Sequence, residues 1–395
     1  MIIEQIKEEI TKENGWISFD RFMFLALYRG NGSFYNREVT DKRNFPIGRS
    51  GDFITHSSLG FWMAKAYAKA FVTLHSKCNP KTELCIREYG PGSGELAALI
   101  LIELFNQNIM PIRYEMIEIS SFFKEKQKSN IEKIIGSYNR ELLPQIKNIF
   151  EWKKIQVEYD NFHASTELKP ITGLIIVNEI IDAFPVKVGL WQQNSPIFEL
   201  GVSKDEINQL TLAFREASSE LKTRINQRKT QSENLGNYWN KSRMIDVCCY
   251  TENWLEKMTK TFVGGQILIS DYGMERIELD HVDRIESTVT GFRQHEQIHK
   301  LIECIQTPGE IDLTHKIDFS QITDFFNIKK NVDISLKTQA AWLIDSGIMD
   351  DLEKYIATGA GDVDFNKNIK HLQKLLLDTE MGQVFLVFSI VKSFL

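Results

Sequence analysis

A glycine-rich turn carries the first candidate chemistry of this sequence. It reads Glu88-Tyr-Gly90-Pro91-Gly92-Ser-Gly94 and follows a short apolar run that predicts a strand. Glycines let a backbone approach a ligand closely, and the helix predicted next offers N-terminal N–H groups to a negative group. The third glycine comes too early for the dinucleotide fingerprint, and no phosphate-loop lysine follows. The pattern favours the glycine loop of S-adenosylmethionine (SAM) enzymes, with an ordinary strand–helix turn as the alternative.

Glu118 is the second candidate, because it ends the next predicted strand. Doubly wound sheets bind ligands at the carboxyl ends of their strands, and an acidic residue about 20 positions past the glycines can accept ribose hydroxyl hydrogen bonds. Glu118 follows Gly94 by 24 positions. We therefore predict that Glu118 binds the ribose of the cofactor. A solvated glutamate at the start of a helix is the alternative.

A third group of polar residues follows another buried strand. The segment reads Asn178-Glu179-Ile-Ile-Asp182-Ala183-Phe-Pro185, directly after Gly-Leu-Ile-Ile-Val. Glu179 and Asp182 are three positions apart, so on a helical turn they share one face. This is also the place where α/β enzymes put their chemistry. We predict that Asn178, Glu179 and Asp182 are catalytic; the alternative is a helix cap.

A zinc-protease pattern occurs further along, at His295-Glu296-Gln-Ile-His299. In that motif two histidines one helical turn apart bind zinc, and the glutamate is the general base. No G-x-x-H extension supplies a third ligand here. An accidental match in a loop-rich region is therefore favoured, and we predict no metal site.

The expected elements place these residues in an α/β protein. Strands that alternate with helices from Lys81 onward imply right-handed crossovers and a Rossmann-like, mostly parallel sheet. Residues 155–159 are predicted to be one of its strands and residues 245–262 a helix. The long polar loop 31–56 is predicted to be a lid over the cofactor. The proposed parts are a helical region (1–80), the first part of the main domain (81–190), an insertion with a strand pair and helix (191–245), and the second part (246–395).

Composition narrows the classes of function. The 395 residues carry 47 Lys and Arg against 53 Asp and Glu, a net charge of -6. Nucleic-acid binding needs a basic field, so we expect no nucleic-acid partner. The five cysteines include no C-x-x-C pair, which fits a reducing compartment. No apolar run approaches the roughly 20 residues of a membrane span, and the first residues do not resemble a signal or transit peptide. A cytoplasmic protein is expected.

Five motifs together resemble the MidA family of SAM-dependent methyltransferases, which includes a mitochondrial complex I assembly arginine methyltransferase. Their order in the chain is GDFIT, EYGPGSGEL, IIVNEIIDAFPV, ISDYG and TPGEIDLTHKIDF. The resemblance implies a class I methyltransferase sheet with an added helical region. It assigns the family's cofactor residues to Glu88, Gly90, Pro91, Gly92, Gly94 and Glu118, and the preceding segment to Asp52 and Thr55. The sequence departs from the family pattern at His56-Ser57-Ser58, at Thr290, where arginine is usual, and at Met274, where an aromatic residue is usual.

The expected activity is methyl transfer from SAM to a protein side chain. By resemblance the acceptor is an arginine of a respiratory complex I-type subunit. A protonated guanidinium would be matched by paired carboxylates, so Glu179 and Asp182 would orient it and take up its proton. The main alternative is a SAM-binding fold that serves as an assembly chaperone without catalysis. The oligomeric state stays open.

Overall fold

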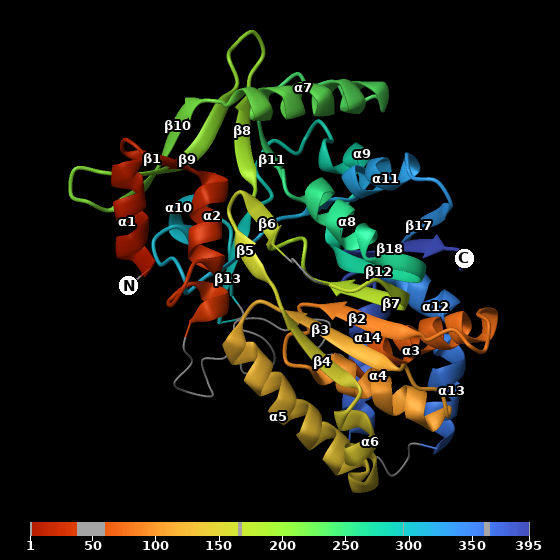
Figure 1. Ribbon diagram of the computed structural model, residues 1–395. Helices are drawn as coiled ribbons and strands as arrows, with labels where there is room; N and C mark the ends of the chain where they lie inside the picture. Colours follow the sequence, from red (N-terminus) through yellow and green to blue (C-terminus); the bar gives the residue numbers. More distant parts are fainter. Residues whose placement is uncertain (1, 38–59, 165–167, 295, 359–363, 395) are drawn as a thin grey trace.

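The main sheet of the protein is mostly parallel, as the alternation of strands and helices predicts. The computed structural model describes residues 2–37, 60–164, 168–294, 296–358 and 364–394 (Figure 1). The sheet order is β17-β18-β12-β7-β2-β3-β4, and β2, β3, β4, β7 and β12 are parallel neighbours. Its strands are β2 (Cys85–Tyr89), β3 (Arg113–Glu118), β4 (Phe150–Lys154), β7 (Ile171–Asn178), β12 (Phe262–Met274), β17 (Val332–Thr338) and β18 (Phe385–Lys392).

The last strand of the chain reverses direction within this sheet. β18 lies between β12 and β17 and runs antiparallel to both. The short β16 (Ile317–Asp318) adds a parallel pairing to the end of β12. The order also reverses between β2 and β7, because the chain builds outward to β3 and β4 on one side and to β12 on the other. This reversal is the switch point at which doubly wound sheets bind ligands.

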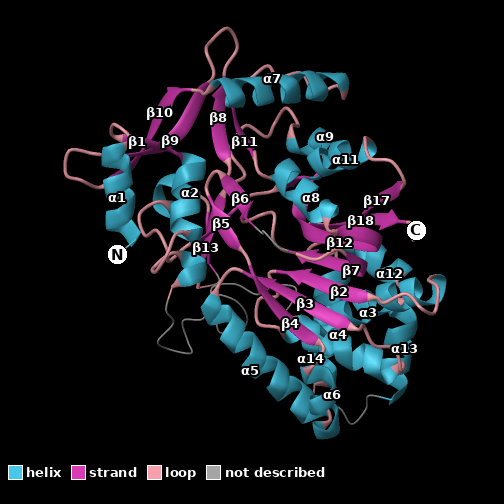
Figure 2. Cartoon of the chain, in the orientation of Figure 1, coloured by secondary structure: helices cyan, strands magenta, loops and turns pink. Residues whose placement is uncertain are grey.

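Helices cover both faces of the sheet (Figure 2). Leu174 and Ile176 of β7 join one apolar cluster, and Ile175 and Val177 join the other, so the strand is buried on both faces as predicted. The helices of the first cluster are α3 (Gly60–Lys77), α4 (Glu95–Asn106), α5 (Ser121–Tyr138), α6 (Leu143–Lys147), α12 (Gln339–Asp345), α13 (Ile348–Thr358) and α14 (Phe365–Leu376). α8 (Thr251–Lys260) and α11 (Phe319–Asn327) pack into the second.

A second, antiparallel sheet contains most of the predicted insertion, and it is larger than the expected strand pair. Its order is β1-β9-β8-β11, with β10 also paired to β9. The strands are β1 (Trp16–Ser18), β8 (Lys187–Trp191), β9 (Phe198–Lys204), β10 (Leu210–Glu216) and β11 (Arg243–Val247). The pairing of β1 with β9 joins α1 (Ile2–Lys12) and α2 (Phe19–Tyr28) to this sheet, whereas α3 packs on α4. The division of the chain into parts stays a proposal.

Two local predictions were wrong. Residues 155–159 do not pair with the main sheet: β5 (Gln156–Glu158) forms a hairpin with β6 (Asn161–Ala164), and β4 takes the place in the main sheet. Residues 245–247 belong to β11, so the helix that follows, α8, begins only at Thr251.

Short elements fill the loop-rich region after β12. They are α9 (Arg276–Leu279), β13 (Thr290–Arg293), β14 (Glu296–Ile298), α10 (Leu301–Cys304) and β15 (Asp312–Thr314), and two short helical turns, η1 (Phe34–Asn36) and η4 (Arg140–Leu142), lie elsewhere. Among the described helices none is both long and apolar enough to cross a membrane.

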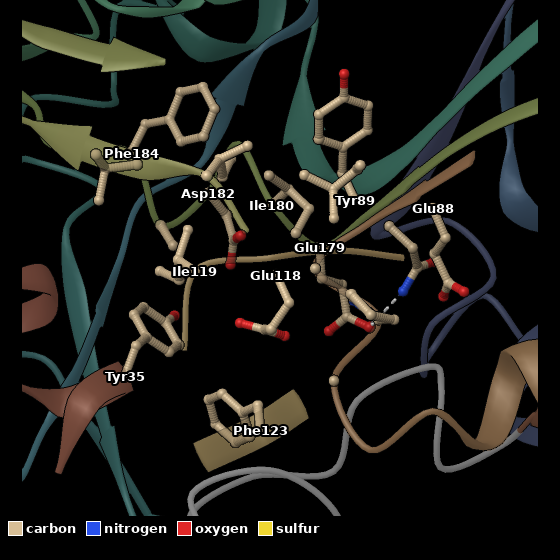
Figure 3. Close-up of a pocket in the computed structure, with 18 of the residues that line it drawn as sticks. Tyr35, Glu88, Tyr89, Glu118, Ile119, Phe123, Glu179, Ile180, Asp182 and Phe184 are labelled. Carbon is tan, nitrogen blue, oxygen red and sulfur yellow. Dashed lines mark hydrogen bonds between the residues drawn. The ribbon is translucent and has the colours of Figure 1, made fainter. Parts of the chain in front are cut away.

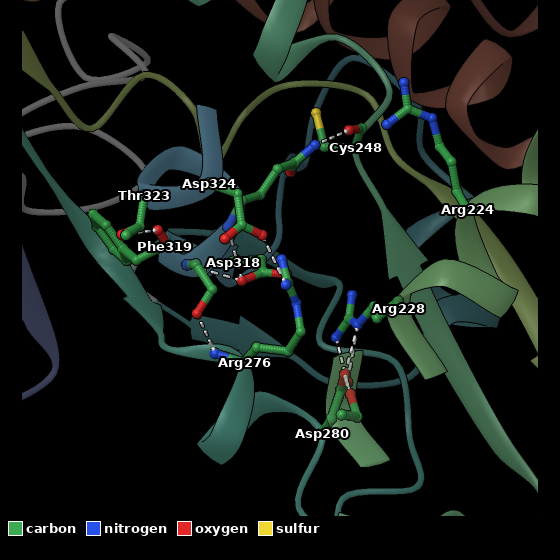
Figure 4. A network of polar contacts seen from close by, with 12 residues as sticks. Arg224, Arg228, Cys248, Arg276, Asp280, Asp318, Phe319, Thr323 and Asp324 are labelled. Carbon is green, nitrogen blue, oxygen red and sulfur yellow. Dashed lines mark hydrogen bonds and ion pairs between the residues drawn. The ribbon is translucent and has the colours of Figure 1, made fainter. Parts of the chain in front are cut away.

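Buried ion pairs tie α7 (Ser219–Asn234) of the second sheet to this region (Figure 4). Arg228 pairs with Asp280 at 2.5 Å and donates a hydrogen bond to the Asp246 carbonyl. Arg276 pairs with Asp318 at 3.0 Å and with Asp324 at 2.9 Å. Paired, hydrogen-bonded charges hold a fixed geometry. The Arg228 pair therefore fixes α7 against the segment after α9, and the Arg276 pairs fix α9 against α11.

Candidate functional site

A pocket opens at the switch point, where β2, β3 and β7 end (Figure 3). The described residues that line it include eight of the predicted site residues: Glu88, Gly90, Pro91, Gly92, Glu118, Asn178, Glu179 and Asp182. Three predicted segments that are far apart in the sequence therefore meet in one cavity. Gly94 stands just outside this lining, at the N-cap of α4. Asp52 and Thr55 lie outside the described residues.

The glycine turn is held in a left-handed backbone conformation. The φ angles of Gly90, Gly92 and Gly94 are +57°, +52° and +78°, a region that costs glycine little. A Cβ on Gly90 would lie 2.2 Å from Cδ1 of Ile180, so the turn also packs closely against the Asn178–Asp182 segment. The residue type at these positions thus follows from the backbone geometry.

Glu118 is buried at the end of β3, and Gln127 of α5 joins it to the glycine turn. Oε1 of Glu118 accepts a hydrogen bond from the Ser120 N–H at 2.8 Å, and Oε2 accepts one from Nε2 of Gln127 at 2.7 Å. The same Nε2 donates to the Gly92 carbonyl at 3.0 Å. Each carboxylate oxygen has further lone pairs, so Glu118 can still accept from a ligand. The sequence reasoning missed Gln127, because a helical glutamine has no local signal.

The Asn178–Asp182 segment is a turn, and Asp271 of β12 organises it. Oδ2 of Asp271 accepts hydrogen bonds from three consecutive backbone N–H groups, those of Ile180, Ile181 and Asp182, at 3.1–3.4 Å. Glu179 adopts a φ of +51°, which is strained for a residue with a side chain. The segment contains no helix, so neither the helix cap nor the helical turn that would put Glu179 and Asp182 on one face describes it. Asp271 belongs to the ISDYG motif, but its contact with the turn could not be read from spacing.

Burial controls the charge of the acidic groups. Desolvation raises the pKa of Glu88, Glu118 and Asp182 to about 7 each. Tyr114 donates to Glu88 at 2.7 Å, which partly offsets the effect there. Burial, and then the nearby charges of Asp182 and Glu179, hold the pKa of Asp271 well above its usual range. Carboxyl groups that titrate near neutrality can both bind a cation and take up a proton.

Aromatic residues from outside the main sheet also line the pocket. Tyr28 of α2, Tyr35 of η1 and Phe162 of β6 line it, together with the carboxylate of Asp312 from β15. The sequence reasoning did not select any of these four residues. The only available signal was the family motif TPGEIDLTHKIDF, which contains Asp312.

The zinc-protease pattern is not built as such a site. Glu296 begins β14, a strand, so the helical spacing that would bring two histidines to one metal is missing there. His295 lies outside the described residues, and His299 is exposed. Within the described part of the chain, no group of three or more His, Cys, Asp or Glu side chains could hold a metal ion.

Three features together define a class I SAM-dependent methyltransferase. They are the reversed last strand beside a parallel sheet, the glycine turn after β2 and the acidic residue that ends β3. The model of a family described as "Putative S-adenosyl-L-methionine-dependent methyltransferase" matches residues 66–336, more than half of the chain. The chain belongs to this family, and SAM is its cofactor. The resemblance noted in the sequence motifs is confirmed.

Curated relatives and a solved structure agree with this assignment. The chain is 22% identical over 377 residues to "Protein arginine methyltransferase NDUFAF7, mitochondrial" of Danio rerio, covering 89% of this chain and 79% of that protein. It is 24% identical over 345 residues to the Drosophila melanogaster homologue, covering 84% and 71%. A Burkholderia thailandensis crystal structure with S-adenosyl-homocysteine bound shares the fold, with a TM-score of 0.78 and 22% identity over 99% of this chain and 92% of that chain. The curated relatives are named as mitochondrial proteins, which contradicts the predicted cytoplasmic location.

Proposed function

We propose that this methyltransferase methylates an arginine side chain of a protein. The named activity of the curated relatives supports an arginine acceptor. The family resemblance extends the proposal to a subunit of a respiratory complex I-type assembly. The observation that carries the proposal is the acidic turn (Asn178–Asp182), because the buried Asp182 and Glu179 line the same pocket. A guanidinium is the side chain that two carboxylates match best.

The cofactor half of the proposal assigns SAM to the glycine turn and Glu118. The turn presents backbone to the pocket through Gly90 and Gly92, and Glu118 has lone pairs for ribose hydroxyls. Ile119 and Phe123 form an apolar wall beside Glu118 that suits an adenine ring. Asp52 and Thr55 remain proposed cofactor residues outside the described part of the chain.

For methyl transfer, the protein mainly has to position the acceptor and accept its proton. SAM, when bound, supplies a methyl group that is already electrophilic. Glu179 and Asp182 would hold the guanidinium in line and keep water away from it. As the new N–C bond forms, the nitrogen gives up a proton, and a carboxylate accepts it. Asp182, whose pKa is raised to about 7, suits that role at neutral pH.

The decisive experiment combines an acceptor assay with one conservative variant. Purified protein and SAM are added to proteins from cells that lack this gene, and new methylarginine is located by mass spectrometry. Glu179→Gln keeps shape but removes charge, so we expect turnover to fall at least ~100-fold with S-adenosyl-homocysteine affinity within about threefold of the parent. The control is Glu125→Gln, an exposed change on α5 that should leave both unchanged.

Two results would contradict the proposal, and each would refute a different part of it. Methylation of a residue other than arginine would refute the acceptor but keep the enzyme class. Parental turnover in Glu179→Gln would refute the role of the acidic turn.

A further inference from the structure

Part of the pocket lining combines aromatic rings with buried carboxyl groups. The rings of Tyr28 and Tyr35 lie 5.4 Å apart, and those of Tyr28 and Phe162 lie 5.0 Å apart, nearly perpendicular. Asp182 and Asp312 line the same cavity. Four separate segments thus contribute these residues: the N-terminal helices, the β5–β6 hairpin, the turn after β7 and β15.

We propose that these five residues, Tyr28, Tyr35, Phe162, Asp182 and Asp312, form an acceptor cage that selects a guanidinium. This inference rests on the proposed arginine methylation and adds to it the residues that recognise the acceptor. Its new members are Asp312, which supplies a second carboxylate to the same cavity, and Tyr35, which positions Asp312.

The geometry of Asp312 supports this assignment. Its side chain is fully buried in β15, and Tyr35 donates its hydroxyl hydrogen bond to Oδ1 at 3.0 Å. Tyr28 is fixed as well, since its hydroxyl donates to the Ala183 carbonyl at 2.8 Å, one residue beyond Asp182. The carboxylates and rings are therefore held before an acceptor arrives, which lowers the entropic cost of binding it.

The electrostatics point to a cation. After burial itself, the charges of Asp312 and Asp182 raise the pKa of both Tyr28 and Tyr35, so both carboxylates act on both rings. A cation over an aromatic face is attracted by the ring, and burial strengthens that attraction. Figure 3 shows Tyr35 and Asp182 directed toward the centre of the cavity, where Glu118 also points.

The combination of carboxylates and aromatic rings in the cage favours a guanidinium over an ammonium. A guanidinium is flat, stacks on aromatic rings and presents several N–H donors to carboxylates, whereas an ammonium is a compact, strongly hydrated point charge. Two carboxylates and neighbouring rings can satisfy the edge and the face of a guanidinium at once. A lysine side chain would leave part of this geometry unused.

Small probes test the cage without knowledge of the protein substrate. Calorimetry measures the binding of n-propylguanidinium, n-butylammonium and neutral n-propylurea to the full-length protein saturated with S-adenosyl-homocysteine. We expect n-propylguanidinium to bind at least ~10-fold more tightly than n-butylammonium, and n-propylurea not to bind measurably. Equal affinity for the two cations would overturn the selectivity.

Two variants then isolate the new residues. Asp312→Asn removes the charge and keeps an oxygen for Tyr35, so n-propylguanidinium affinity should fall at least ~10-fold. Tyr35→Phe keeps the ring and removes the hydroxyl that donates to Asp312, and we expect a roughly threefold to tenfold loss of n-propylguanidinium affinity. Affinity for S-adenosyl-homocysteine should stay within about twofold in both variants, because neither change touches the glycine turn or Glu118.

The matched control is Asp318→Asn. Asp318 undergoes the same chemical change six positions away, pairs with Arg276, and is not among the described residues that line the cavity. It should lower the melting temperature without changing probe affinity. Parental affinity of Asp312→Asn and Tyr35→Phe for n-propylguanidinium would overturn the cage and leave arginine methylation standing. Failure of the parent to bind S-adenosyl-homocysteine would overturn the proposed function and the cage together.

Discussion

At the scale of single residues, Gly92 has a left-handed backbone conformation and also lines the pocket proposed for the cofactor. It lines the pocket with a φ of +52°, and its carbonyl is held by Gln127. Gly92→Val places a branched side chain where the proposed cofactor binds. We expect S-adenosyl-homocysteine affinity to fall at least ~100-fold while the protein stays folded, as measured by calorimetry and circular dichroism.

Gly236→Val separates the steric effect from backbone strain. Gly236 also has a positive φ, +89°, but its Cβ position has no atom within 4 Å and it is exposed. Both variants should lose a similar amount of stability, on the order of 1–2 kcal/mol. Unchanged cofactor affinity in Gly92→Val would remove the glycine turn from the proposed site.

Local spacing predicted some site residues and could not predict others. The glycine turn, Glu118 and the Asn178–Asp182 segment each follow a buried strand, so topology alone brings them to one edge of the sheet. Tyr35 and Asp312 meet across 277 positions of sequence, and no periodic pattern records such a contact. Residues of that kind can be found only when the fold is known.

At the scale of elements, the link between β12 and the acidic turn is the contact most open to test. Asp271→Ala would leave the N–H groups of Ile180, Ile181 and Asp182 without their buried acceptor. We expect the free energy of unfolding to fall by about 3 kcal/mol and kcat by at least ~10-fold, with KM for SAM changing less. Chemical denaturation and steady-state kinetics measure both.

Asp271→Asn is the rescue variant for this positioning role. Asparagine removes the charge but keeps a side-chain oxygen that can accept the hydrogen bonds of the Ile180, Ile181 and Asp182 N–H groups. Stability and kcat should recover most of the loss seen with alanine. A variant with parental kcat but low stability would show that Asp271 supports the fold without positioning the turn.

The elements that were mispredicted share a physical cause. β5 has three residues, too few for a periodicity to show, and it pairs antiparallel with its hairpin partner β6. Residues 245–247 were assigned to a helix because the α8 pattern follows them closely. They instead pair antiparallel with β8 and belong to the strand β11. Long, strongly patterned elements such as α4 and β7 were predicted, since their burial is encoded locally.

At the scale of the whole molecule, the pocket is shared between the main sheet and its additions. The main sheet supplies the glycine turn, Glu118 and the acidic turn, whereas α2, η1, the hairpin and β15 supply the opposite wall. The cofactor is therefore proposed to bind on the main sheet, and the acceptor between the acidic turn and these additions. This arrangement allows a family to keep its cofactor while the acceptor wall varies.

The pocket also makes stability depend on pH, through three carboxyl groups in one cavity. The pKa of each is raised by burial, from 4.5 to about 7 for Glu88 and Glu118 and from 3.8 to about 7 for Asp182. At pH values between the unfolded and the folded pKa of each group, the folded protein binds more protons than the unfolded chain. The stability they contribute is thus fully present below the unfolded pKa values and is lost as the pH rises through about 7. His315, whose pKa is lowered by burial, acts in the opposite direction.

We expect the cofactor-free protein to lose stability, on the order of a few kcal/mol, as the pH rises from about 5.5 to about 8. Chemical denaturation at several pH values measures the slope. Glu118→Gln removes one titrating group, so its slope should be shallower than that of the parent, whereas the exposed Glu125→Gln should reproduce the parental slope. Because the comparison uses slopes, any uniform destabilisation of Glu118→Gln cancels, and so does the opposing contribution of His315. Equal slopes in the parent and Glu118→Gln would mean that Glu118 is already ionised in the empty pocket.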